Sequence, residues 1–177
     1  MRILRLSNRT AGDLLAARRR RDVAAEQTAA RILADVRRGG DRALLRWTGR
    51  LDGLRLTPRT LWVRPGEFRS ARRKVSAEFV RAVRHAARNI RRVAERQKPG
   101  PWSFAVEPGV RVGQRIVPLE IIGCYIPGGR SSLVSTLLMT AIPAQVAGVR
   151  RIVVTCPRPN RPLLAAASLL VKCTVPV

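Results

Sequence analysis

The sequence has few aromatic residues, three cysteines and one histidine. Aromatic residues make up 4% of its 177 positions, so leucine, valine, isoleucine and alanine must supply the core. Cys124, Cys156 and Cys173 are widely spaced and form no C-x-x-C pair, and His85 is the one histidine. The sequence therefore offers no Cys/His cluster of the kind that holds zinc. We interpret the cysteines as reduced and structural, since buried free thiols are common in apolar strands.

Long apolar runs are also absent. No stretch approaches the roughly 20 apolar residues of a membrane-spanning helix. Residues 1–6 lack the longer apolar region and the cleavage site of a secretory signal. With 46% hydrophobic residues, the chain can bury one core and is too apolar for a disordered protein. These features predict a cytoplasmic globular protein with no membrane partner.

Negative charge is scarce. The chain has 35 basic and 11 acidic residues, a net charge of +24, and all but three of the basic residues are arginine. Such a chain attracts polyanions. However, the arginines are scattered, and no aromatic residues alternate with them to stack on bases. A GC-rich genome also favours arginine over lysine. We expect only non-specific contact with nucleic acid, although a polyanion-binding protein remains the alternative function.

The first hundred residues are predicted to be mostly helical. Asp13 can cap a first helix, which Gly39-Gly40 ends, and Asp41 can cap the next. Apolar residues recur in the first helix at steps of three and four: Val23, Ala24, Thr28, Ile32, Leu33 and Val36. The longest helix is expected from Ser76 to the proline-rich stretch 99–101. His85 falls off its apolar stripe and is interpreted as solvent-facing.

From about residue 105 the pattern changes to strands alternating with helices. Within residues 110–118, strand-forming residues alternate with turn residues, as is typical of a hairpin. The segments after it are an apolar strand at 119–126, a glycine loop at 127–129, a helix from Ser135 to Gly148, a strand at 151–157 and a helix from Pro162. This order fits a parallel βαβ unit. The predicted fold class is α/β, with a helical N-terminal part.

The candidate site lies in the loop between the first parallel strand and its helix. Ligands of open α/β sheets gather where a strand's carboxyl end feeds a helix. Gly128 and Gly129 let the backbone approach a phosphate or ribose, and Tyr125 can lay its ring against a nucleotide. The loop is neither G-x-G-x-x-G nor a Walker motif. Taken alone, it is equally consistent with glycines that serve only the turn.

A longer stretch of sequence around this loop favours the nucleotide-binding interpretation over the turn interpretation. Residues 118–130 read PLEIIGCYIPGGR and residues 135–149 read STLLMTAIPAQVAGV, which is similar to the signature region of histidinol dehydrogenases. GDRAL at 40–44 and PGV at 108–110 also resemble landmarks of that family. The resemblance runs from about residue 10 to about residue 170. It covers less than half of the family's usual length.

The resemblance implies a function. Histidinol dehydrogenases oxidise L-histidinol to L-histidine through the aldehyde, with two NAD molecules in turn, a zinc ion and a Glu-His pair that handles protons. They are intertwined homodimers with incomplete Rossmann-like domains. By position, Tyr125 matches a tyrosine that contacts NAD, and Pro127, Gly128 and Gly129 shape the loop beside it.

The same resemblance predicts what this chain lacks. The family's zinc ligands (a glutamine, two histidines and an aspartate) and its general base belong to a later portion with no counterpart here. We therefore expect a truncated chain with no catalytic or metal-binding residue, inactive alone. Two variants of this hypothesis remain. In one, the chain is half of a split enzyme and a complementary C-terminal chain supplies the rest. In the other, it is a regulatory module that pairs with a full-length enzyme. The expected domains are 1–122, a helical part with the hairpin and the first piece of a discontinuous domain, and 123–177, the start of an incomplete Rossmann-like NAD-binding domain.

Overall fold

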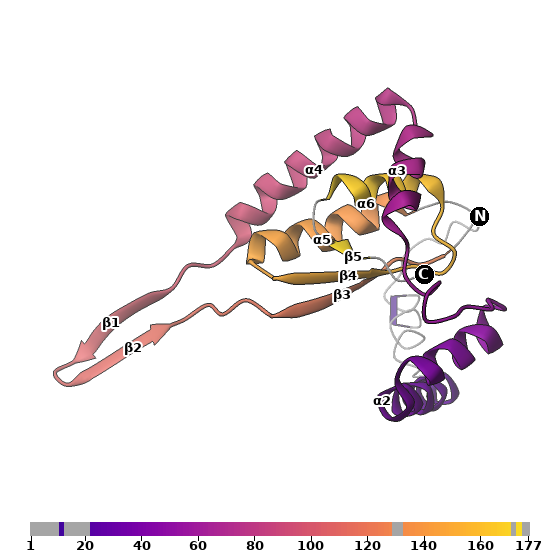
Figure 1. Ribbon diagram of the computed structural model, residues 1–177. Helices are drawn as coiled ribbons and strands as arrows, with labels where there is room; N and C mark the ends of the chain where they lie inside the picture. The colour runs from indigo at the N-terminus through magenta and orange to yellow at the C-terminus, as the bar shows by residue number, and fades with distance from the viewer. Residues whose placement is uncertain (1–10, 13–21, 129–132, 171–172, 175–177) are drawn as a thin grey trace. The chain divides into compact units, whose positions relative to one another are not determined.

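The computed structural model describes residues 11–12, 22–128, 133–170 and 173–174. These residues form an α/β structure of helices and two small sheets (Figure 1). Internal contacts divide the chain into two compact units, Met1–Leu56 and Thr57–Val177. No helix in the described ranges is long and apolar enough to span a membrane.

The first unit is built on one kinked helix, α2 (Val23–Leu51). The helix begins after Asp22, whose carboxylate accepts a hydrogen bond of 2.9 Å from the backbone N–H of Ala25. Gly40 has φ 53° and ψ −142°, which interrupts the helical geometry. Glycine adopts this conformation at little cost, so the predicted helix end is a kink, directly followed by Asp41. The other predicted cap, Asp13, lies outside the described residues.

Within this unit, Asp35 joins the two halves of α2. Its carboxylate accepts hydrogen bonds from Trp47 Nε1 at 3.2 Å and from Arg38 at 3.2 Å, and lies 3.4 Å from Arg46. The hydrogen bond from Trp47, helped by the two arginines, lowers the pKa of Asp35. The predicted apolar stripe is mostly uncovered, with Val23 and Leu33 each 58% exposed. Among the described residues of this unit, α2 finds too little partner surface to bury the stripe.

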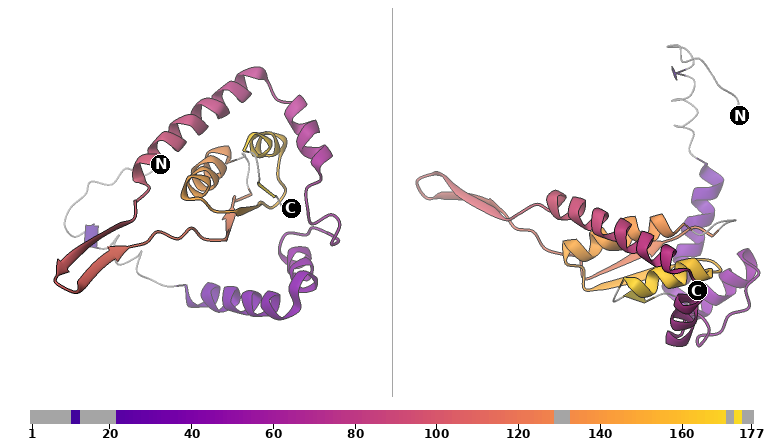
Figure 2. Two further views of the ribbon diagram at one scale, coloured as in Figure 1. Left: turned by 60° about the vertical axis from the view of Figure 1, so that its left-hand side comes forward. Right: turned by 90° about the horizontal axis from the view of Figure 1, so that it is seen from above.

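The second unit has three layers. The first layer is a parallel sheet in the order β3-β4-β5, with β3 at Ile121–Tyr125, β4 at Arg151–Thr155 and β5 at Cys173–Thr174. Helices α5 (Val134–Ala147) and α6 (Arg161–Leu169) cover one face of the sheet (Figure 2). Outside them, α3 (Pro65–Arg73) packs on α6, and α4 (Ala77–Gln97) packs on α5. The predicted order of parallel strands and helices is confirmed.

Local signals explain where these helices begin and end. Ser76 caps α4 by accepting a 3.1 Å hydrogen bond from the N–H of Phe79. Asn160 caps α6 by accepting a 3.1 Å hydrogen bond from the N–H of Leu163, just before the proline-containing first turn. Gly148 ends α5 with φ 90°. These positions agree with the helix boundaries expected from the sequence.

The sheet has a closed face and an open face. Its closed face points at α5 and α6 and consists of alternate side chains of β3 and β4, continued one residue past each strand: Ile122, Cys124, Ile126, Ile152, Val154 and Cys156. On the other side, the open face carries Ile121, Gly123, Tyr125, Arg151, Val153 and Thr155. Ile126 and Val154 are 0% exposed, whereas Tyr125 is 59% exposed. The core of the second unit therefore lies on one side of its sheet.

The antiparallel hairpin precedes this sheet. Its strands are β1 (Trp102–Glu107) and β2 (Val110–Gln114), and every residue of both is exposed. The alternation at 110–118 covers only the second strand of the hairpin, whose first strand comes earlier. The turn lies at Pro108-Gly109, within the landmark that resembles the family's hairpin. Gly109 has φ 83°, a left-handed conformation that the turn requires. The alternation of residues 110–118 alone did not reveal this turn.

Candidate functional site

Tyr125 lies at the carboxyl edge of the parallel sheet. It is the last residue of β3 and pairs in register with Thr155, the last residue of β4. Immediately after it, the N–H of Ile126 donates a 2.8 Å hydrogen bond to the carbonyl of Thr155. The backbone on both sides of Tyr125 is thus held by the sheet, while the residue is 59% exposed on the open face. The ring is held at its base and accessible to a ligand.

The surface beside Tyr125 is small and uncrowded. Gly123 lies on the same face of β3, and a Cβ placed there would meet nothing within 4 Å. Across the ladder, Val153 and Thr155 complete this platform. Sequence reasoning did not select Val153 or Thr155, although alternation along β4 would place both on Tyr125's face. A flat aromatic or heterocyclic ligand can therefore lie here without displacing a side chain.

Gly128 serves close packing between loops. A Cβ built on it would lie 3.0 Å from the carbonyl oxygen of Pro157 and 3.4 Å from its Cβ. The loop after β3 therefore approaches the loop after β4 more closely than a side chain would allow. This contact supports the turn interpretation of Gly128. Pro127 is exposed beside it, and Gly129 lies outside the described residues.

The start of α5 faces the same edge of the sheet, because parallel strands deliver their following helices there. Leu133, at its N-cap position, gives no side-chain hydrogen bond, and the first turn has no acidic residue. The start of α6, in contrast, is capped by Asn160. The positive end of α5 is consequently suited to an anionic group such as a phosphate.

The described residues do not fit a zinc site. They contain no group of three or more His, Cys, Asp or Glu side chains that could hold a metal. His85 is exposed on α4, where its Nε2 lies 3.1 Å from Asn89 Nδ2, which agrees with the solvent-facing prediction. Cys124 and Cys156 are free and buried on the closed face, and burial raises the pKa of Cys156.

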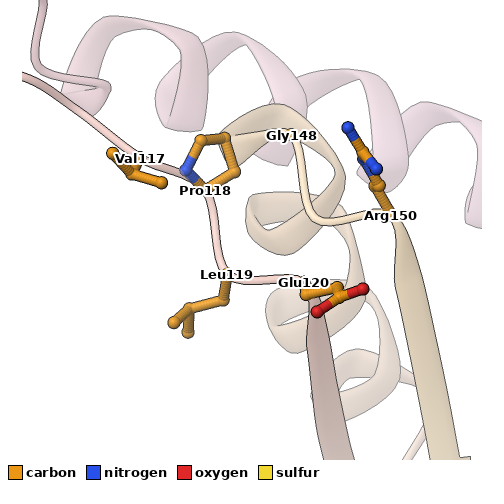
Figure 3. A pocket seen from close by; sticks show the side chains of 6 residues that line it. All are labelled: Val117, Pro118, Leu119, Glu120, Gly148 and Arg150. Atoms are coloured by element: carbon orange, nitrogen blue, oxygen red, sulfur yellow. The ribbon is translucent and has the colours of Figure 1, made fainter.

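A cavity of about 540 Å³ lies at the opposite edge of the sheet (Figure 3). It is lined by Val117, Pro118, Leu119, Glu120, Gly148 and Arg150. These residues precede β3 and β4, so the cavity is at the amino ends of the strands, away from Tyr125. Its two charged side chains form no ion pair among the described residues. The cavity is separate from the candidate nucleotide site.

Comparison with known proteins assigns the family. The model of the family described as histidinol dehydrogenase matches residues 16–175. The chain belongs to the histidinol dehydrogenase family. The resemblance seen in the loop after β3 and in α5 is thereby confirmed, and so is the α/β fold class.

Individual histidinol dehydrogenases match over most of this chain. The protein from Syntrophotalea carbinolica is 45% identical over 148 residues, which is 81% of this chain and 34% of that protein. The protein from Nitratidesulfovibrio vulgaris is 44% identical over 167 residues, 90% of this chain and 38% of that protein. A crystal structure of histidinol dehydrogenase from Elizabethkingia anophelis superposes with a TM-score of 0.77 at 30% identity, covering 90% of this chain and 37% of that one. The chain thus spans little more than a third of these relatives.

Proposed function

We propose that this chain is the NAD-binding front portion of a histidinol dehydrogenase, which oxidises L-histidinol to L-histidine. One observation carries the proposal: in a chain of this family, the single tyrosine stands exposed at the carboxyl edge of a parallel sheet. The loop that follows leads to α5, whose N-cap residue Leu133 gives no side-chain cap. Such an edge is where open α/β sheets bind nucleotides.

Each group at this edge has a distinct part in holding NAD. Tyr125 offers a ring face for stacking and a hydroxyl for hydrogen bonding. The positive end of α5 attracts the pyrophosphate. Pro127 and Gly128 keep the loop in place, through the close approach of Gly128 to Pro157. When bound, NAD supplies the hydride acceptor.

The proton chemistry must come from elsewhere. The described open face carries no imidazole or carboxylate, and a general base has to lie within hydrogen-bond reach of the reacting hydroxyl. The described residues also offer no zinc cluster. We therefore propose that residues 1–177 bind NAD but do not oxidise histidinol by themselves, and that a complementary C-terminal portion provides the base and the zinc ligands.

The domain organisation is part of the same proposal. We propose that residues 123–177 begin a Rossmann-like domain and that 1–122 belong to a second, discontinuous domain. The run of parallel strands β3, β4 and β5, with a helix in each connection, supports the first part. A cytoplasmic homodimer, as implied for this biosynthetic family, completes the proposal.

The test is NAD binding by the purified chain, measured by isothermal titration calorimetry. Tyr125→Ala should weaken NAD binding about tenfold or more, since stacking of a base on an aromatic ring contributes about 1–3 kcal/mol. Ile121→Ala is the matched control, because Ile121 lies on the same strand and face at the far end and is 44% exposed. It should leave NAD binding unchanged.

Two results would contradict the proposal. One is equal NAD affinity in the Tyr125 and Ile121 variants, which would place the nucleotide elsewhere. The other is reduction of added NAD to NADH by the 177-residue chain when L-histidinol is the substrate and zinc is present, since that would require a base and a metal site within it.

A further inference from the structure

The solvent-facing side of α3 and α4 is strongly basic. Sequence order scatters the arginines, but helical geometry gathers eight cations on the sides of these two helices that face away from the core. We call this set the α3–α4 basic surface: Arg69, Arg73, Lys74, Arg81, Arg84, Arg88, Arg92 and Arg96. All eight residues are exposed.

On α4 the cations form a straight stripe. From Arg81 to Arg96 they follow at steps of three, four, four and four residues, which keeps them on one helix face. The apolar residues Phe79, Val83 and Ile90 lie on the opposite face, in or against the core. The stripe is about 22 Å long, at 1.5 Å per residue. Glu78 and Glu95 are its acidic neighbours, and within the described ranges no carboxylate forms an ion pair with any of the eight cations.

This arrangement has an electrostatic cost. Arg84, Arg88, Arg92 and Arg96 place like charges at successive i,i+4 positions, which destabilises an isolated helix. Four arginines of the first unit have partners instead: Arg38 and Arg46 contact Asp35, and Arg31 and Arg50 lie over the ring of Trp47. A polyanion would relieve the repulsion on α4.

The cations at α3 line a cavity, which we call the α3 seat. This cavity of about 390 Å³ is lined by Gly66, Arg69, Ser70, Arg73 and Lys74. Three cations, a hydroxyl and no carboxylate line it, a combination that favours phosphate. The nearest acid of this helix, Glu67, is occupied by a 2.8 Å hydrogen bond from the backbone N–H of Arg64.

We propose that the α3–α4 basic surface binds the phosphate backbone of double-stranded nucleic acid without sequence preference, a function beyond NAD-dependent oxidation. A duplex carries one charge per about 1.7 Å of its axis, so the 22 Å stripe runs past about a dozen phosphates. No aromatic side chain stands within the stripe, so stacking on single-stranded bases is not favoured. A membrane-surface helix needs a free apolar face, but that of α4 is packed on α5.

The test compares two variants of equal net charge. Duplex binding is followed by fluorescence anisotropy across a salt series, with a labelled DNA of roughly 20 base pairs, about two helical turns. In R81Q/R88Q/R92Q, affinity should fall about tenfold or more, and the slope of log K against log salt should flatten by about 2 to 3. The control R37Q/R42Q/R59Q removes three exposed arginines outside α3 and α4 and should stay within about twofold of wild type.

Two further variants complete the experiment. R81K/R88K/R92K keeps the charge and should retain the salt slope, and R69Q/R73Q tests the α3 seat if the α4 glutamine variant unfolds. Equal losses in the α4 and control triples would mean that net charge alone drives binding, and would overturn the proposal. So would the absence of wild-type duplex binding at about 0.15 M salt, or binding to phosphatidylserine vesicles alone.

Discussion

The two faces of the parallel sheet differ in how deeply their side chains are buried. Along β3, Cys124 is 3% exposed and its neighbour Tyr125 is 59% exposed, although the two share a backbone and a hydrogen-bond ladder. The closed face meets α5 and α6, while neither of these helices packs on the open face. Alternation by two residues thus lets a single strand supply both core packing and a ligand surface.

This difference separates stability from binding. Substitutions on the closed face and its covering helices should cost folding free energy, because buried apolar contacts are lost. Substitutions on the open face should leave stability nearly unchanged and act on ligands instead.

The largest effect is expected in α5, the helix that covers the closed face. Leu137 is 0% exposed and Met139 is 57% exposed on the same helix. Leu137→Ala should lower the free energy of unfolding by about 3–5 kcal/mol, through lost transfer energy and a cavity. Met139→Ala should change it by less than about 0.5 kcal/mol. Urea unfolding followed by circular dichroism measures both, and similar losses would show that α5 has no buried side.

A smaller effect is expected within β4, where neighbouring valines point to opposite faces. Val154 is 0% exposed, whereas Val153 is half-buried on the open side. Val154→Ala should cost about 2 kcal/mol, at roughly 0.8 kcal/mol per buried methylene plus a cavity term. Val153→Ala should cost less than about 1 kcal/mol by the same scale. If the two unfolding curves coincided, the distinction between the faces would fail.

The cap of α6 is expected to contribute less again. Asn160→Ala removes the acceptor for the N–H of Leu163 and should cost about 1 kcal/mol. Asn89→Ala, in the exposed interior of α4, is the matched control and should be neutral within about 0.5 kcal/mol. Thermal and urea unfolding of both variants measure these changes in unfolding free energy. A neutral Asn160 variant would mean that packing alone positions α6.

The smallest effect concerns the thiol of Cys156 on the closed face. Burial raises its pKa above the ordinary value of 9.0, so its contribution to stability is complete below that pH and is lost as pH rises through the folded-state pKa. Unfolding free energy should therefore decline above about pH 9, less so in Cys156→Ala. Iodoacetamide should label Cys156 slowly in the native chain and rapidly in urea, as mass spectrometry can resolve. Fast native labelling would contradict the burial.

Much of the architecture was predictable because its signals are local. Caps, glycine stops and apolar periodicity placed α4, α5 and α6, and the βαβ order followed from them. Alternation covered only the second strand of the hairpin, because the pattern after Val110 is visible in the sequence while the partner strand before Pro108 is recognised only through pairing. For the site, Tyr125 was selected through resemblance, whereas Thr155 and Val153 were missed, since cross-strand neighbours depend on register.

The sequence by itself determined the family, the helix limits and the two kinds of strand residue, because these depend on neighbours a few positions apart. Tertiary structure alone decided three things. It brought Gly128 against Pro157, which made that glycine a packing residue. It left one sheet face uncovered beside Tyr125. It also assembled arginines from two helices on one side of the second unit. Each depends on contacts between segments distant in sequence, which composition and periodicity do not encode.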